Sequence, residues 1–208
     1  MGPQESSGVL RSPQESSGVL RGTQVLGACR YERLWELGKA FGLQHVGLQA
    51  LASLRMEKGY RDYGHDMDNT DRILESGLAF TCDFEKPGGF IGKEATLKHK
   101  LDATGGKGTG TLNLAQRLVL FKLLDPDAMM FHGEVLWRDG KRVGDVRAAA
   151  FGHTIGACVG IAHVRGEPFV TAKWLQEGEW HVEVAERRYR IALSLKPFYD
   201  PTNQRIRC

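Results

Sequence analysis

The spacing of hydrophobic positions changes about halfway along the chain. In the first half, Leu34, Leu37 and Phe41 recur at intervals of three and four residues, which predicts a helix over Tyr31–Leu43. Gly42 stands at the end of this pattern, where glycine commonly stops a helix. Apolar and polar residues alternate in the second half instead, which is the pattern of strands with one buried face.

The remainder of the first half predicts a mixture of short helices and strands that is followed by a flexible segment. The glycine-rich stretch ATGGKGTG at 103–110 has a lysine that is followed by glycine, so it lacks the Ser or Thr of a phosphate-binding loop and predicts a linker. The elements predicted before it are a helix at Val46–Ser53, strands at Leu54–Tyr60 and Leu78–Phe84, and a helix at Lys93–Leu101.

The second half predicts short antiparallel strands that form a sandwich or a barrel. Asp139-Gly140 is a two-residue hairpin signal between two short strand patterns. The predicted strands are Arg117–Leu123, Val135–Arg138, Lys141–Val146, Trp180–Val184 and Tyr189–Leu195.

The first 22 residues contain a direct repeat, PQESSGVLR, at Pro3–Arg11 and again at Pro13–Arg21. The repeat is polar and has no apolar stripe, so it predicts a disordered segment. Arginine and serine are also typical of transit peptides, but Glu5 and Glu15 argue against one.

Composition excludes several classes of protein. The net charge of +3 and the absence of a long basic run argue against a nucleic-acid partner. No stretch of about 18 apolar residues is present, which argues against a membrane span. Cys29, Cys82, Cys158 and Cys208 form no CxxC pair, so they predict free thiols rather than a zinc site.

Polar residues that could carry chemistry gather between residues 54 and 68. On the predicted strand, Arg55 and Glu57 share a face, and by periodicity alone they form a surface ion pair. His65, Asp66 and Asp68 could be drawn as a metal site, but neighbouring polar residues in a turn are more often solvated. No GxGxxG dinucleotide fingerprint occurs in the chain.

The same segment resembles a known family. The stretch LRMEKGYRDYGHDMD is similar to part of the folate-binding module that the glycine-cleavage T-protein shares with sarcosine and dimethylglycine dehydrogenases. The motifs EKGYR and GLAFT favour the dehydrogenases over the T-protein. The segments that carry the resemblance are Leu54–Asp68, Glu75–Thr81, Phe90–Ala95, Val143–Arg147 and Pro197–Pro201.

The resemblance implies an α+β fold, in which an incomplete ferredoxin-like α/β unit precedes a C-terminal antiparallel β-barrel. The domains expected are a disordered segment at 1–22, the α/β unit at 23–102, a linker at 103–114 and the barrel at 115–208. It also implies a tetrahydrofolate site. Glu57 would hold the pterin ring, because a carboxylate offers two acceptors to a parallel pair of donors.

Three further residues are candidates for the folate site. Arg55 would orient Glu57 or be structural, and Tyr60 and Tyr63 would stack on the ligand, line its channel or pack as half-buried groups. No catalytic residue and no metal are expected in this chain. Phe131 stands where T-proteins usually carry an arginine, which makes a true T-protein less favoured.

The function expected is that of a folate-binding fragment or subunit of a flavin-dependent dehydrogenase of N-methyl amino acids, which passes a one-carbon unit to folate. FAD would belong to an upstream domain or a partner subunit, so we expect no dehydrogenase activity from this chain alone. The alternatives are an aminomethyltransferase of the glycine cleavage type and a non-catalytic subunit resembling the regulatory subunit of pyruvate dehydrogenase phosphatase. The family implies the mitochondrial matrix, although the chain has no convincing transit peptide.

Overall fold

A computed structural model describes residues 17–207, and describes side chains from residue 27 onward. These residues form two units, the first ending at Val46 and the second beginning at Gly47. The helices are α1 (Ser17–Gly38), α2 (Leu48–Lys58), α3 (Lys93–Ala103) and α4 (Ala172–Gln176), with short 3-10 turns η1 (Lys39–Phe41) and η2 (Ala79–Thr81). The strands are β1 (Gln116–Leu123), β2 (Val135–Arg138), β3 (Lys141–Gly152), β4 (Ala157–Arg165), β5 (Trp180–Val184) and β6 (Arg187–Ser194).

The first unit consists of α1, η1 and a short extended segment. The helix predicted here is confirmed, and it continues after Gly38 as η1, which Gly42 ends in the left-handed conformation with a φ of 72°. The ring of Trp35 stacks on that of His45 at 3.8 Å between centroids. The segment predicted to be disordered lies within α1 from Ser17 onward, and residues 1–16 lie outside the described residues.

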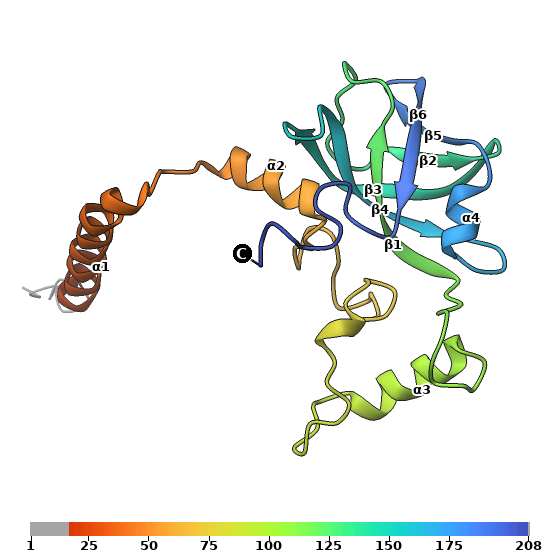
Figure 1. The fold of residues 1–208 in the computed structure, drawn as a ribbon, viewed down its shortest axis with the longest axis horizontal. Helices are drawn as coiled ribbons and strands as arrows, with labels where there is room; N and C mark the ends of the chain where they lie inside the picture. The colour runs from red at the N-terminus through yellow and green to blue at the C-terminus, as the bar shows by residue number, and fades with distance from the viewer. Residues whose placement is uncertain (1–16, 208) are drawn as a thin grey trace, which may run out of the picture. The chain divides into compact units, whose positions relative to one another are not determined.

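In the second unit, six antiparallel strands close into a barrel in the order β1-β4-β3-β2-β5-β6 (Figure 1). The predicted hairpin is confirmed, because Asp139 and Gly140 join β2 to β3 with φ values of 50° and 78°. The five residues of α4 are the only helix described between β1 and β6. The α+β class and the C-terminal barrel are therefore confirmed.

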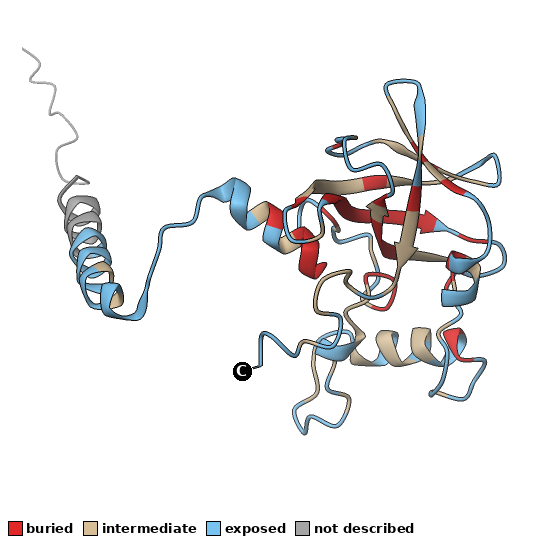
Figure 2. Ribbon diagram, turned by 45° about the horizontal axis from the view of Figure 1, so that its top comes forward, coloured by how far each residue is buried: buried red, intermediate tan, exposed pale blue. Residues whose placement is uncertain are grey.

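Apolar side chains cover both surfaces of β1 and β4. On β1, Val119 and Phe121 point into the barrel, whereas Leu118 and Leu120 pack outside it against Met56 of α2. Phe121 fits because its ring lies against Gly160 of β4, where a Cβ would approach its Cζ to 2.6 Å. Figure 2 shows the buried residues concentrated on the barrel strands and on the C-terminal half of α2.

The two strands predicted before the barrel are wrong. Leu54–Tyr60 belongs largely to α2, because Leu48–Lys58 consists of strong helix formers and Ser53, Met56 and Glu57 bury one helical face. Leu78–Phe84 contains only η2. Among the described residues, the part of the chain before the barrel therefore has helices and loops but no strand, apart from one isolated bridge between Tyr63 and Met67.

Gly59 ends α2 and allows it to lie close to the barrel. Its φ of 63° is in the left-handed region, and its N–H closes the helix on the carbonyls of Arg55 and Met56. A Cβ at this position would come within 2.7 Å of the Leu120 side chain. Glycine is therefore required here for both its conformation and its size.

None of the helices in the described part of the chain is long and apolar enough to cross a membrane. Of the four cysteines, Cys29, Cys82 and Cys158 are free thiols, and Cys208 lies outside the described residues.

Candidate functional site

The candidate site is built around the C-terminal end of α2, where polar side chains join the helix to the barrel. Glu57 is buried, with 2% of its surface exposed. Its Oε1 accepts hydrogen bonds from the backbone amides of Thr154, at 2.6 Å, and Ile155, at 3.1 Å. Among the described residues, no hydrogen-bond donor reaches Oε2.

The turn that receives Glu57 joins β3 to β4. Its geometry leaves little room, because a Cβ at Gly152 would lie 3.0 Å from Oε1 of Glu57. One helical turn earlier, the hydroxyl of Ser53 donates to the carbonyl of Phe151 at 2.6 Å. Helix α2 is thus fixed to this turn by two polar side chains, and the Glu57 carboxylate is held in one orientation.

Arg55 does not contact Glu57. Its Nη1 forms an ion pair with the fully buried Asp66 and also donates to the carbonyl of Tyr60 at 3.1 Å. The surface ion pair between Arg55 and Glu57 is therefore wrong, because residues two apart on a helix point to nearly opposite sides. Arg55 organises the loop after α2 rather than the Glu57 carboxylate.

Asp66 is the centre of that loop. Its Oδ2 also accepts from the backbone N–H of Asp62 at 2.8 Å, while its Oδ1 is buried without a partner. Arg61 lies nearby and donates to the carbonyls of Gly59 and Ser76. Burial lowers the pKa of the Arg61 guanidinium, and the charge of Asp66 opposes this shift.

Lys58 connects the end of α2 to the C-terminal segment. Its Nζ donates to the backbone carbonyl of Asp200 and to the side-chain oxygen of Asn203, both at 2.8 Å, and lies 3.2 Å from the carboxylate of Asp200. Desolvation raises the pKa of Asp200. Hydrogen bonds from Lys58 and from the amides of Gln204 and Arg205 lower this pKa by more, so the net shift is downward. This places the closing motif Pro197–Pro201 against α2.

Tyr60 and Tyr63 are exposed, with 53% and 67% of their surfaces accessible. They are not half-buried packing groups, and neither lines a described cavity.

The carboxylate of Asp68 accepts hydrogen bonds from both the backbone N–H and the hydroxyl of Thr70, and these bonds lower the pKa of Asp68. No cluster of three metal-ligating side chains occurs in the part of the chain that the structure describes.

A cavity of about 350 Å³ opens on the other side of α2 from Glu57. Arg55, Arg147 and Asp62 line it, together with His65 and His132. Each of the two arginines is paired with a carboxylate, Arg55 with Asp66 and Arg147 with Asp145. Phe131, which stands where T-proteins usually carry an arginine, also lines this cavity and is exposed. Glu57 does not line this cavity.

Sequence reasoning assigned no role to Lys58, Asp66 or Arg147. Asp66 was weighed only as a metal ligand, although its position in the resembling segment was a signal. Arg147 lies in the resembling segment Val143–Arg147, and no local pattern indicated its neighbours. Their partners lie on other elements, so the fold was needed to find them.

Comparison with known proteins places these features in context. Residues 23–86 match the GCVT N-terminal domain, and residues 116–200 match the glycine cleavage T-protein C-terminal barrel domain. The chain resembles a solved structure of glycine cleavage system aminomethyltransferase T from Bartonella henselae, with a TM-score of 0.64 and 22% identity, over 84% of this chain and 45% of that one. That likeness shows the fold.

Three relatives extend the comparison. A 4-methylaminobutanoate oxidase (formaldehyde-forming) from Paenarthrobacter nicotinovorans is 39% identical, and mitochondrial sarcosine dehydrogenase from Mus musculus is 34% identical, each over 85% of this chain. The mitochondrial regulatory subunit of pyruvate dehydrogenase phosphatase from Mus musculus is 29% identical over 80% of this chain. The chain spans only 18–19% of the length of these relatives.

Proposed function

Because the chain belongs to the family of the glycine cleavage T-protein and its dehydrogenase relatives, we propose that it is the tetrahydrofolate-binding part of a flavin-dependent dehydrogenase of N-methyl amino acids. The substrate class follows from the names of two relatives, which act on 4-methylaminobutanoate and sarcosine. A flavin-binding domain or subunit oxidises the N-methyl group, and the folate module receives the one-carbon unit.

The geometry of Glu57 carries this proposal. A carboxylate that is buried and held by two backbone amides is already oriented before a ligand arrives. Oε2 has no described protein donor, so this one oxygen can accept a hydrogen bond from a ring nitrogen or an exocyclic amine of a pterin. Such charge-assisted bonds are stronger than neutral ones, and a preorganised acceptor avoids the entropy of ordering a side chain.

The remaining candidate residues take supporting roles in this proposal. Arg55 holds the loop of Asp66 in place, and the exposed rings of Tyr60 and Tyr63 are free to stack on a ligand.

The proposal assigns FAD to a partner domain or subunit, and the protein to the mitochondrial matrix, as the names of its mitochondrial relatives suggest. The exposed apolar residues Leu48 and Leu51 of α2, together with Phe80 and Ile91, would contact the part of the folate module that supplies the rest of the site.

Calorimetric titration of the chain with folinic acid, a stable reduced folate, tests the proposal. We expect saturable binding that Glu57→Gln weakens about ten- to hundredfold, because one charge-assisted hydrogen bond contributes about 1.5–3 kcal/mol. The glutamine carbonyl can still accept from Thr154 and Ile155, so the fold is kept, while its amide presents a donor to the ligand's own donors. Tyr60→Phe is the matched control, since it removes a hydroxyl and keeps the ring.

Binding that Glu57→Gln leaves unchanged would contradict the assignment of Glu57. Absence of binding by folded wild-type chain would favour the second candidate function, a non-catalytic regulatory role. The similarity to the phosphatase regulatory subunit over 80% of this chain is the observation that favours this alternative. The aminomethyltransferase alternative predicts binding of folinic acid as well, and is tested separately by transfer from an aminomethylated lipoyl carrier.

A further inference from the structure

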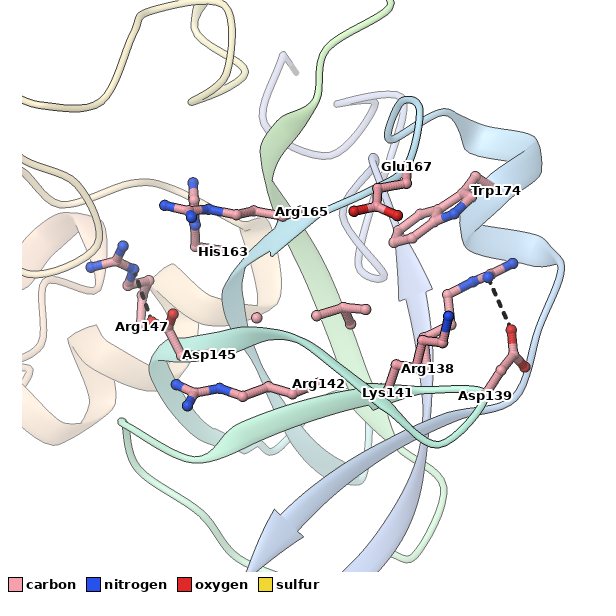
Figure 3. Close-up of a pocket in the computed structure, with 12 residues that line it drawn as sticks. Arg138, Asp139, Lys141, Arg142, Asp145, Arg147, His163, Arg165, Glu167 and Trp174 are labelled. Atoms are coloured by element: carbon pink, nitrogen blue, oxygen red, sulfur yellow. Dashed lines mark ion pairs between the residues drawn. The ribbon is translucent and has the colours of Figure 1, made fainter.

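A second polar cavity lies on the barrel itself, apart from Glu57. It has a volume of about 660 Å³ and is formed by the β2–β3 hairpin, the end of β4 and α4. We call it the basic groove, and the residues that define it here are Lys141, Arg142, Arg147, His163, Arg165 and Glu167. Figure 3 shows Arg147, His163 and Arg165 towards one end, with Arg138, Asp139 and Trp174 at the other.

The positive charge of the basic groove is only partly compensated. Arg138 pairs with Asp139 at 2.9 Å, and Arg147 lies 3.3 Å from the carboxylate of Asp145. Among the described residues, no carboxylate lies within 4.0 Å of the charged groups of the other three cations, and Glu167 is the one remaining acid in the lining. The three cations that remain are Lys141, Arg142 and Arg165.

The groove also contains buried nitrogen atoms that have no hydrogen-bond partner among the described residues. His163 is 6% exposed, and its Nε2 is buried with no hydrogen-bond partner. The Nε of Arg147 is buried as well, and its ion pair with Asp145 lacks the alignment of a hydrogen bond. The Nε of Arg138, which also lines the groove, is a third buried nitrogen without a hydrogen-bond partner among the described residues. Buried polar groups are nearly always satisfied, so three unsatisfied nitrogens in one cavity indicate a missing partner.

The fold holds these groups at fixed positions. His163 lies opposite Asp145 across the β3–β4 ladder, next to Gly144. A Cβ at Gly144 would overlap the backbone carbonyl of His163, so only glycine lets the two strands approach this closely. This explains part of the segment Val143–Arg147, whose composition the folate proposal leaves unused.

We propose that the basic groove binds a small dianion that carries oxyanion groups, either phosphates or carboxylates. Three cations against one carboxylate leave a balance of two positive charges, which a dianion neutralises. Arginine forks match the oxygens of both groups, and the N–H of His163 donates to the same ligand. The site is independent of Glu57 and of folate binding.

Calorimetric titration of the full chain with pyrophosphate and, separately, with citrate tests the site. We expect saturable binding at one ligand per chain in at least one titration, and the tighter ligand identifies the oxyanion class. Arg142 and Arg165 are both exposed. Each of the variants Arg142→Gln and Arg165→Gln should weaken binding about tenfold. Arg187→Gln removes the same charge from an exposed position outside the groove and should leave the affinity within about twofold.

His163→Phe tests the buried nitrogen, and it should weaken binding several-fold. If this variant does not fold, the His163 ring resonances of the wild-type chain provide the second measurement, because they should shift on addition of the ligand. The proposal is overturned if neither anion binds the folded chain, if Arg187→Gln weakens binding as much as Arg165→Gln, or if the His163 resonances do not respond.

Discussion

The barrel and the segment that precedes it, from α2 to α3, are held together in different ways. The barrel has a closed ladder of strands around an apolar interior, in which Phe121, Leu136 and Val182 have no exposed surface. The preceding segment has small apolar clusters and depends on polar contacts, such as those of Glu57 with Thr154 and Ile155. The barrel is therefore a scaffold, and the segment that carries the proposed folate residues takes its order from it.

The contacts between these two regions are directional. The amide of Leu118 donates to the carbonyl of Glu75 at 2.9 Å, and the side chain of Gln116 donates to the carboxylate of Glu75 at the same distance. Together with the hydrogen bonds of α2, they fix the segment to the barrel at two places, α2 and Glu75. Because a hydrogen bond requires alignment and apolar burial does not, this arrangement sets position more sharply than it adds stability.

The largest effect should follow from emptying the barrel core. Phe121→Ala removes a ring that packs against Gly160, and we expect a loss of about 3–5 kcal/mol in the free energy of unfolding. Urea denaturation followed by tryptophan fluorescence measures it. The control is Phe80→Ala, at a position that is 83% exposed, which should change stability by less than about 0.5 kcal/mol. Equal losses in the two variants would mean that the barrel is not the stable region.

A smaller and more local effect should follow from removing the hydrogen bonds by which Glu57 of α2 binds the β3–β4 turn. Glu57→Ala leaves the amides of Thr154 and Ile155 without their acceptor, and we expect a loss of about 1.5–3 kcal/mol. Hydrogen exchange should show reduced protection in α2 and at these two amides, with the β1–β4 ladder unchanged. Glu57→Gln is the matched control, because it retains an acceptor. A uniform loss of protection across the barrel would show that the two regions are one cooperative unit.

The two regions also differ in how much the sequence revealed. The strands β5 and β6 and the hairpin at Asp139-Gly140 were predicted because their signals are local, namely alternation and turn chemistry. The strand β4 was not individually predicted, since Ala157–Val164 is buried throughout and therefore shows no alternation. Its outer surface is covered by α2, which the sequence pattern could not show.

The site was less predictable than the fold for the same reason. Glu57 binds residues that lie 97 and 98 positions further along the chain, so no spacing in the sequence indicates the contact. Helix α2 itself was misread where Leu54–Tyr60 was predicted to be a strand. Leu54 and Met56 would share a face of a strand, but Leu54 is 53% exposed and Met56 is 3% exposed, which fits a helix with one face on the barrel. Propensity was the better guide at this point, because Leu48–Lys58 contains no β-branched residue.

The smallest expected effect on stability concerns His163, a buried residue of β4 whose Nε2 has no hydrogen-bond partner among the described residues. Burial lowers the pKa of its imidazole from the ordinary value of 6.5, Arg147 and Arg165 lower it further, and Asp71 and Asp145 oppose the shift. At a pH below 6.5 the unfolded chain takes up a proton that the folded chain does not, until the pH reaches the lowered folded pKa. The contribution of the neutral imidazole to the free energy of unfolding should therefore be fully present above pH 6.5. It should decrease as the pH falls from 6.5 to the lowered folded pKa, by at most about 1.4 kcal/mol per pH unit.

His163→Phe should remove this part of the pH dependence, because phenylalanine does not titrate. The measurement is urea denaturation at several pH values between about 5 and 7, with phosphate and citrate left out of the buffers. Stability of the wild-type chain that does not decrease with acidification in this range would contradict the prediction. If the variant is also the more stable protein at the acid end and the weaker binder of pyrophosphate, the buried nitrogen stabilises a ligand rather than the fold. Glu57 differs from His163, because its carboxylate is already bound by two amides of the protein and therefore stabilises the fold as well.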